Sequence, residues 1–338
     1  MPYRDDAGPG RLSDPCVFCE SISKTHVFES RGFDDPREKF RLIRCSSCGL
    51  VRLDPLPDPG VLGTYYSRAY YGSETRKFNE YVEALVRAEN MRRSSKLKKL
   101  LLTYGVAFPA KILDVGCGRG NFLKASKQLG FECCGIEIDE FGSLDLGKDI
   151  IFLRGHLEDL PIQEGTFDAV SIWHVLEHTL NPAAAIKKAA QVLRPGGIIA
   201  IAVPNFGSFQ SYVFGGYWFH LDLPRHVYHF SKDALVSKLR EHNLEPIKIS
   251  TASIGQNCFG FIQSSLNLLF PAGMANLLFK RLKNRGAIST GSACICKLAL
   301  LGNMIAVALL LPLALLENLF SVLLGKGATL VIYARKKA

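Results

Sequence analysis

The sequence predicts an α/β protein, in which helices cover both faces of a parallel sheet. Short apolar segments typical of buried strands alternate with helix-like segments from about residue 106 onward. The stretch Lys111–Gly120 (KILDVGCGRG) has an apolar strand, an acid and alternating glycines that lead into a helix. Because glycine tolerates positive φ and a helix N-terminus favours polar or anionic groups, this turn predicts a ligand site at the carboxyl edge of the sheet.

The remaining elements follow in order along the chain. A helical pattern covers residues 74–104, and Asn181 is a suitable N-cap for an Ala-rich helix. Pro195-Gly-Gly predicts a turn before the fifth strand. The expected strands are 112–115, 133–138, 150–153, 167–173, 198–203, 247–251 and 329–334. The other expected helices are 121–130, a weak one at 140–149, 182–193 and one from residue 231.

Four motifs follow one another along the chain: DVGCGRG, GIEID, FDAVSIWHVLEH and LRPGGIIAIAVPN. With this order and spacing, residues 111–205 resemble a class I S-adenosylmethionine-dependent methyltransferase. The resemblance implies a Rossmann-like seven-stranded methyltransferase sheet with S-adenosylmethionine as cosubstrate. An acid such as Glu137 at the end of the second strand suits the two ribose hydroxyls. At two positions where the family often has an acid and a small residue, this chain has His156 and Leu157. The expected cofactor-binding residues are Asp114, Gly116, Cys117, Gly118, Gly120, Glu137, Ile138, His156, Leu157 and Trp173.

Candidate catalytic histidines follow the fourth strand. Ubiquinone-type O-methyltransferases resemble this region with an E-x-x-E-H pattern that can hold a divalent cation. Here His174 replaces the first acid, while Glu177 and His178 match. A general base at His174 or His178 and a cation at Glu177 and His178 are alternatives, because histidine titrates near neutral pH.

The aromatic segment 217–230 matches the W-x-x-x-D-x-P-R-H-x-x-H-F pattern of the same family, and it makes His226 a further candidate base. This segment is expected to form either a lid over the substrate or a packed aromatic loop.

Near the N-terminus, two C-x-x-C pairs predict a structural zinc site. Cys16, Cys19, Cys45 and Cys48 would complete a tetrahedral shell with no open position for substrate. Two unrelated thiol pairs or a redox pair are the alternatives. The tyrosine-rich stretch that follows resembles zinc-containing methyltransferases of sugar metabolism. Ten cysteines, four of them in such pairs, favour a reducing compartment.

The expected domains are a zinc ribbon with its Pro-rich connector (1–60), a helical cap (61–105), the core (106–255 and 327–338) and an apolar insertion (256–326). Leu298–Leu316 is long enough to span a bilayer. A single crossing would prevent the last strand from rejoining the sheet, so we expect the insertion to lie in the cytoplasmic leaflet. A buried helical pair or a dimer contact are the alternatives.

Together these features predict methylation of a small-molecule or lipid-linked acceptor, with a histidine base and O-methylation favoured, at the inner face of the cytoplasmic membrane. The formal net charge of +10 leaves nucleic acid as an alternative partner, with the zinc ribbon for recognition. No interleaved basic and aromatic surface supports that option. A zinc-containing sugar C-methyltransferase and a non-catalytic scaffold are further alternatives. The oligomeric state stays open.

Overall fold

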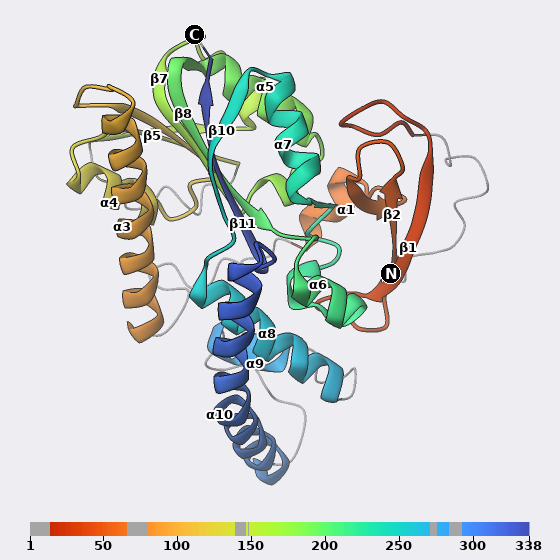
Figure 1. Cartoon of the computed structure of the whole chain (residues 1–338). Coiled ribbons are helices and arrows are strands. Elements are labelled where there is room, and N and C mark those ends of the chain that lie inside the picture. The colour runs from red at the N-terminus through yellow and green to blue at the C-terminus, as the bar shows by residue number, and fades with distance from the viewer. Residues whose placement is uncertain are drawn as a thin grey trace. The chain divides into compact units, whose positions relative to one another are not determined.

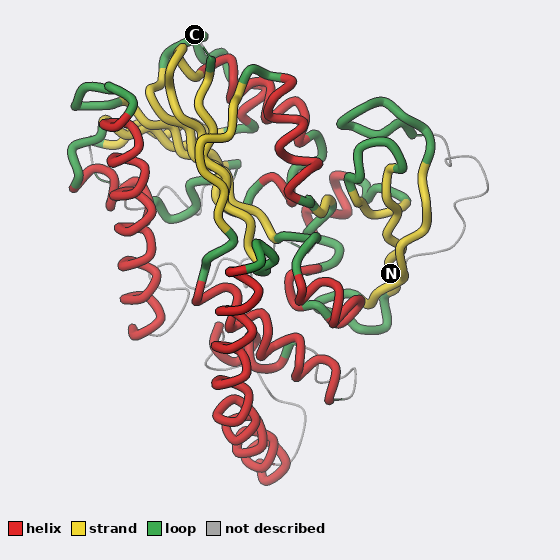
Figure 2. Tube along the Cα trace, viewed as in Figure 1, coloured by secondary structure: helices red, strands yellow, loops and turns green. Residues whose placement is uncertain are grey.

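In the computed structural model (Figures 1 and 2), residues 14–65, 80–138, 147, 149–270, 276–283 and 293–337 are described. The chain separates into two compact units. Unit 1 comprises Met1–Ser73, Pro204–Lys232 and Ser250–Leu330, and unit 2 comprises Glu74–Val203, Asp233–Ile249 and Val331–Ala338. The domain limits expected from the sequence stay a prediction, because these units group segments by spatial proximity alone.

Unit 2 is built on a seven-stranded sheet with the order β10-β11-β8-β7-β4-β5-β6. The five strands from β8 to β6 pair in parallel with their neighbours. Their bounds are β4 Lys111–Val115, β5 Glu132–Glu137, β6 Ile150–Arg154, β7 Phe167–Trp173, β8 Leu193–Pro204, β10 Leu244–Ser250 and β11 Thr329–Lys336. The α/β prediction is therefore confirmed. The chain switches direction across the sheet between β4 and β7, which is where ligands bind in such folds.

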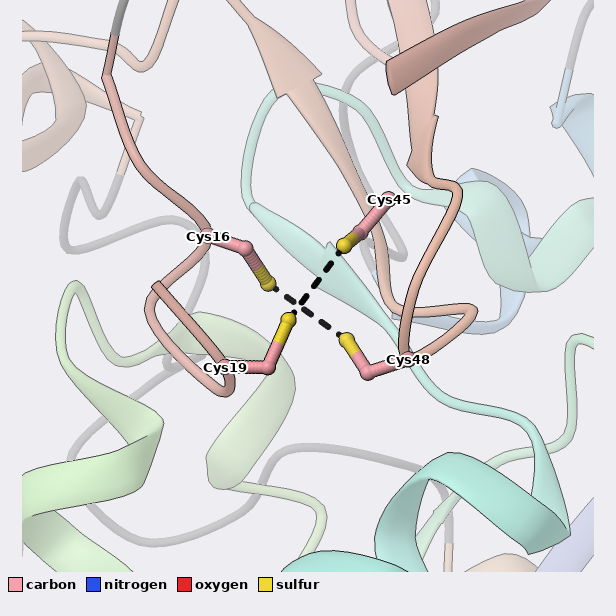
Figure 3. Close-up of side chains that lie close together, drawn as sticks. All are labelled: Cys16, Cys19, Cys45 and Cys48. Atoms are coloured by element: carbon pink, nitrogen blue, oxygen red, sulfur yellow. Dashed lines mark hydrogen bonds between the residues drawn. The ribbon is translucent and has the colours of Figure 1, made fainter. Parts of the chain in front are cut away.

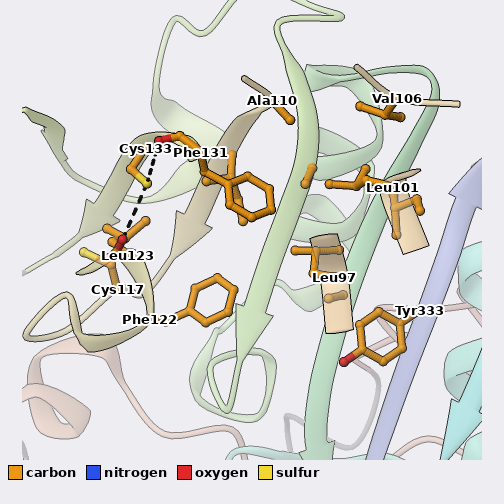
Figure 4. Packing of buried hydrophobic residues seen from close by; sticks show 14 residues of the cluster. Leu97, Leu101, Val106, Ala110, Cys117, Phe122, Leu123, Phe131, Cys133 and Tyr333 are labelled. Carbon is orange, nitrogen blue, oxygen red and sulfur yellow. Dashed lines mark hydrogen bonds between the residues drawn. The ribbon is translucent and has the colours of Figure 1, made fainter. Parts of the chain in front are cut away.

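Helices cover this sheet on both faces, with α3 and α4 on one side and α5 and α7 on the other (Figure 1). Their bounds are α3 Glu80–Thr103, α4 Asn121–Gln128, α5 Pro182–Val192 and α7 Lys232–Glu241, with short 3-10 turns η2 Leu157–Asp159 and η3 Leu176–His178. The core packs Leu97 and Leu101 of α3 against Phe122, Phe131 and strand residues (Figure 4). Asn181 caps α5 as expected, because its side chain accepts from Ala184 N at 3.0 Å.

Some boundaries differ from the expectation. The Pro195-Gly-Gly segment lies inside β8, where the register against β7 jumps from Leu193 to Ile198. The expected turn is therefore an irregularity within one longer strand. The weak helix expected at 140–149 falls almost wholly outside the described residues, as does the start of the helix expected at 74.

Unit 1 contains an antiparallel sheet of the order β1-β2-β3-β9. Its strands are β1 Lys24–Arg31, β2 Lys39–Cys45, β3 Val51–Asp54 and β9 Tyr228–His229. The short helix α1 Pro59–Thr64 follows β3, and α6 Phe209–Phe214 leads into the 3-10 turns η4 Gly215–Tyr217 and η5 Phe219–Leu221. Trp218 and Leu223 pack with β2 and β3 and are nearly inaccessible, at 2% and 1% exposed. The aromatic segment 217–230 is thus packed at these residues, and its expected role as a lid over the substrate stays a prediction.

In its described residues, the insertion in unit 1 contains the helices α8 Ile254–Leu269, α9 Leu277–Lys283 and α10 Ala293–Leu323. Helix α8 packs against α10 through Cys258, Ile262, Leu266 and Ala314 (Figure 1). Within the described residues, Ala306–Leu323 alone is long and apolar enough to cross a membrane, with mean hydropathy 2.1 and 11% of the stretch buried. The apolar insertion before the last strand is confirmed.

In the part of α10 whose side chains are described, polar residues are buried and leucines are exposed, which is the reverse of the pattern in a soluble protein. Its buried side chains are Ala314, Glu317 and Ser321, at one helical face. Leu310 packs against α8, but most of the other described leucines point outward, and Leu309 and Leu323 are 69% and 73% exposed. A helix of a soluble protein buries its apolar stripe, so this surface requires a cover.

Candidate functional site

The turn after β4 has the geometry of a ligand cradle. Gly116, Gly118 and Gly120 adopt φ of 66°, 51° and 68°, a region that glycine enters without steric cost. A Cβ on Gly118 would meet nothing within 4 Å, whereas a Cβ on Gly116 would lie 2.4 Å from a methyl group of Val175. Gly118 therefore faces open space, and Gly116 is required by packing. Cys117 is buried, and burial chiefly raises the pKa of its thiol, so this residue offers its backbone rather than a thiolate.

Glu137 at the end of β5 closes this cradle. Its two carboxylate oxygens accept from Gly118 N and from Ile138 N, each at 2.9 Å. The glutamate thereby fixes the glycine turn against the neighbouring strand. A carboxylate has about four acceptor sites, so these two bonds leave capacity for ligand hydroxyls.

Asp114, the last acid before the glycines, is buried in the sheet. Ser171 Oγ of β7 donates to its Oδ1 at 2.6 Å. Burial raises the pKa of Asp114 to about 7; the bond from Ser171 opposes this rise, and the charge of Glu137 adds to it. The bond between Asp114 and Ser171 thus joins β4 to β7 at the switch point. The sequence motif gave no indication that Ser171 is part of the site.

Of the side chains expected beside an adenine ring, some are exposed and one is buried. Ile138 is 47% exposed next to Glu137. Gly155 N donates to Glu137 O at 3.1 Å, which holds the loop after β6 beside β5. In this loop His156 is exposed, but Leu157 is buried, at 1% exposed. Ile138 and His156 can therefore contact a ligand, while the Leu157 side chain belongs to the core.

Trp173 ends β7 and is covered by a cation. The Arg93 guanidinium of α3 lies 4.8 Å from the centre of the indole ring, and the Trp173 Nε1 is buried without a hydrogen-bond partner among the described residues. In the sequence, Arg93 is one of several basic residues between positions 92 and 99, a pattern typical of a solvated helix face. The structure instead places it at the site, with its side chain 15% exposed. Its sequence position gave no signal for this role.

His174, Glu177 and His178 lie together just beyond β7. His174 adopts φ of 56°, unusual for a residue with a Cβ, and its N–H donates to Ala202 O of β8 at 2.8 Å. Its Nδ1 lies 3.4 Å from Glu177 Oε1. Partial burial, and then the charge of Arg93, lower the pKa of His174 to about 3. His174 is therefore neutral near pH 7 and a weak base. His178 ends the turn η3 and is half-buried.

His226 belongs to unit 1 and is described there. Its Nδ1 lies 2.8 Å from His220 O, and a carbonyl can only accept, so Nδ1 carries the proton. Its Nε2 lies 3.8 Å from Asp222 Oδ2. Arg225 beside it pairs with Asp34 and Asp222, and its guanidinium lies 4.8 Å from the ring centre of Phe33. His226 is thus held in one tautomer by a well-packed loop.

The four N-terminal cysteines converge from two tight turns (Figure 3). Cys16 Sγ lies 3.5 Å from Cys48 Sγ, Cys19 Sγ lies 3.5 Å from Cys45 Sγ, and all four sulfurs fall within 4.8 Å of one another. Four thiolates at about 2.3 Å from one zinc ion would be separated by about 3.8 Å, so the cluster fits that metal. Burial raises the pKa of the Cys45 thiol, but hydrogen bonds from the backbone of Cys48 and Ser47 and from the side chains of Cys19 and Cys48 together lower it to about 7.

Comparisons with known proteins agree with this arrangement. Residues 78–249, just over half of the chain, match the family described as methyltransferase domain. Ubiquinone biosynthesis O-methyltransferase from Xanthomonas campestris pv. campestris (strain B100) is 32% identical over 136 residues, which are 37% of this chain and 57% of that protein. The chain thus spans a little over half of the length of the curated relatives that it matches.

Two solved structures are similar to the chain. A SAM-dependent methyltransferase from Archaeoglobus fulgidus is 18% identical, with a TM-score of 0.45 and coverage of 73% of this chain and 94% of that one. The Burkholderia thailandensis 1,6-didemethyltoxoflavin-N1-methyltransferase is 15% identical, with a TM-score of 0.44 and coverage of 88% and 96%. The family match, the sheet order and the glycine cradle agree, and the chain belongs to the methyltransferase domain family as a class I S-adenosylmethionine-dependent methyltransferase.

Proposed function

We propose that the enzyme methylates a hydroxyl group of a small-molecule or lipid-linked acceptor, at the cytoplasmic surface of a membrane. The observation that carries this proposal is the histidine pair around Glu177 at the carboxyl end of β7, beside the switch point. Similarity to ubiquinone biosynthesis O-methyltransferases over 136 residues supports an oxygen acceptor.

Unit 2 supplies the cofactor site in this proposal. When bound, S-adenosylmethionine supplies an electrophilic methyl group, so the protein has mainly to position the acceptor and remove its proton. Glu137 would accept from the ribose hydroxyls, Ile138 and His156 would lie beside the adenine, and the backbone of Gly118 would face the ligand. Arg93 lies over Trp173, and its Nε donates to Glu89 Oε1 at 3.0 Å; from this position it would supply a cation for the cofactor carboxylate.

We assign the base to His178. His174 is the weaker candidate, because its pKa of about 3 gives little driving force for proton transfer near neutral pH. His174 instead fixes the loop through its bond to Ala202 and its contact with Glu177. His226 stays a candidate to be tested beside it, and so does a divalent cation at Glu177 and His178.

The test measures methyl transfer from labelled S-adenosylmethionine to extracted phenols, quinols and glycolipids. His178→Gln should lower kcat by about 100-fold or more and leave cofactor affinity within about twofold. His174→Gln should lower it less, and His226→Gln serves as the competing assignment. Full activity of His178→Gln would refute the assignment. Activity that disappears with a chelator and returns with a divalent cation would favour the metal alternative.

We further propose that Cys16, Cys19, Cys45 and Cys48 bind one structural zinc ion. Sulfur separations of 3.5 Å and the absence of an open ligand position support this role. The eight cysteines described by the structure are all free thiols, which supports a reducing, cytoplasmic location.

The reversed polarity of the insertion supports membrane contact. Leu309 and Leu323 of α10 and Leu269 of α8 are between 68% and 73% exposed, while Glu317, Asn257 and Gln263 are buried. Polar contacts inside and apolar side chains outside are the arrangement of helices surrounded by lipid. We propose that α8 and α10 enter one leaflet of the membrane.

Replacing the whole insertion is too drastic a test, because Asn257 Oδ1 accepts from Thr329 N at 3.0 Å and α8 packs in the unit 1 core. Leu309, Leu316 and Leu323 are exposed and can be changed to serine together without loss of core contacts. The triple variant should leave the membrane fraction and still bind cofactor. A wild-type protein that stays soluble and monomeric without detergent would refute membrane contact.

A further inference from the structure

Unit 1 contains a large pocket that the methyl-transfer proposal does not use. Its volume is about 860 Å³, and its walls include residues of β1, α6, α8 and α10. Protein pockets that hold small molecules are about 300–1,000 Å³. The space is therefore sufficient for a ligand rather than for a few waters.

The side chains that line the pocket are mainly apolar, and several of them are exposed to solvent. Phe209, Leu313 and Phe320 line it and are 50%, 53% and 61% exposed. Phe28 and Phe261 line it as well and pack against the core cluster of unit 1. An apolar chain in the pocket would remove these side chains from water, which is the driving force for such binding.

Charged groups on the wall indicate the sign of the ligand. Arg44 and Lys326 line the pocket and are exposed, so their cationic groups lie where solvent reaches it. Glu317 also lines it, but this side chain is buried and accepts from Gln210 Nε2 at 2.8 Å. The solvent-accessible charges of the pocket are therefore positive and suit an anionic group.

Helix α10 connects the pocket to the exposed leucines. Leu313 and Phe320 of α10 line the pocket, as does Leu324 just after the helix, and Leu316 and Leu323 of α10 are exposed outside the pocket. A hydrocarbon chain could thus pass from a membrane that covers α10 into the pocket without crossing water.

We propose that this pocket binds the hydrocarbon chain of an anionic membrane amphiphile, with Arg44 and Lys326 at its charged head. The inference rests on the membrane-surface activity proposed above, and it names the class of lipid that the enzyme takes up there. The head group is a phosphate or carboxylate, and the chain is a single acyl or isoprenoid tail.

Photolabelling of the full-length protein in vesicles tests the proposal. The probe is dodecyl phosphate with a diazirine near the end of its chain, and labelled segments are identified by mass spectrometry. Leu313 and Leu316 form a matched pair, because both are 53% exposed on α10 and only Leu313 lines the pocket. Both are changed to glutamate in separate variants, with Arg44→Ala and Lys326→Ala as head-group variants.

We expect saturable labelling of the segments that contain Phe28 and Phe209. Unlabelled dodecyl phosphate should compete, and neither inorganic phosphate nor dodecyltrimethylammonium should do so. Labelling is compared per molecule of vesicle-bound protein, because a glutamate at either position can weaken membrane contact. On that basis, Leu313→Glu should lower the labelling about tenfold, Leu316→Glu less than about twofold, and each cation variant about threefold or more.

Labelling that does not saturate, or that Leu313→Glu and Leu316→Glu reduce equally, would overturn the pocket. Competition by inorganic phosphate would overturn the role of the chain. Cofactor affinity of every variant, measured by calorimetry, should equal that of the wild type. If the pocket is not labelled while the protein binds cofactor and methylates its acceptor, the lipid-pocket inference is refuted and the proposed function is not.

Discussion

Glu137→Gln separates the cofactor role of this residue from its structural role. In the wild type, one carboxylate holds two backbone N–H groups, those of Gly118 and Ile138, at 2.9 Å each. Glutamine has a single side-chain oxygen, so its amide NH₂ must face one of these donors. The variant therefore loses both the negative charge and one acceptor in a site that is 9% exposed.

Two magnitudes follow from this geometry. One unsatisfied buried N–H should lower the free energy of unfolding by about 1–3 kcal/mol. Loss of charge-assisted bonds to the ribose should weaken S-adenosylmethionine binding by about 2 kcal/mol or more, which is roughly 30-fold. The pKa of Asp114 should also fall below its value of about 7, because the Glu137 charge contributes to that rise after burial.

Titration calorimetry and denaturant unfolding measure the two effects separately. Glu132→Gln is the matched control, since Glu132 begins the same strand and is exposed. It should change neither quantity by more than about 0.5 kcal/mol. Unchanged cofactor affinity in Glu137→Gln would refute the assignment of this residue, even if the protein were destabilised.

Three further predictions concern the same unit and the zinc cluster. Gly118→Val should weaken cofactor binding at least about tenfold with a loss of only about 1–2 kcal/mol of stability, because its Cβ meets nothing within 4 Å. Gly116→Val should instead destabilise unit 2, because its Cβ would lie 2.4 Å from Val175, and unfolding curves compare the two. Asp114 has a raised pKa, so its contribution to stability is present below about pH 4 and is lost as pH rises through about 7. The free energy of unfolding of Asp114→Asn, relative to that of the wild type, should therefore increase by about 2–4 kcal/mol as the pH rises from about 5 to about 8. Denaturant titrations at each pH measure this difference. Cys45→Ser should abolish stoichiometric zinc in elemental analysis and leave cofactor affinity unchanged, whereas equal zinc content would contradict the four-thiolate site.

The sheet and the cofactor turn were predictable because local sequence determines them. β4, β7 and β8 are mostly buried, so each contains a short apolar run that identifies it without knowledge of its neighbours. The glycines of the turn and Glu137 lie at fixed offsets from those strands. Parallel pairing then brings their carboxyl ends together.

Other features depend on contacts between distant segments and left no local pattern. Arg93 lies in a run of basic residues that resembles an exposed helix face, and only tertiary packing places it over Trp173. Strand β9 pairs with β3 across a long stretch of intervening chain, and its two residues are too few for any periodicity. The burial of Leu157 and the reversed polarity of α10 likewise became evident only from packing.

The position of the insertion in the sheet limits how it can meet a membrane. β10 and β11 are neighbours in the sheet, so the chain leaves toward α8 and returns from α10 at the same edge. A crossing by α10 would need a second crossing to bring the chain back. Among the described residues, Ala306–Leu323 is the single candidate span, and α8 buries Asn257, Gln263 and Ser264 against protein. We therefore infer that α10 lies within one leaflet, where its outward leucines reach lipid and its Glu317 face stays against the protein.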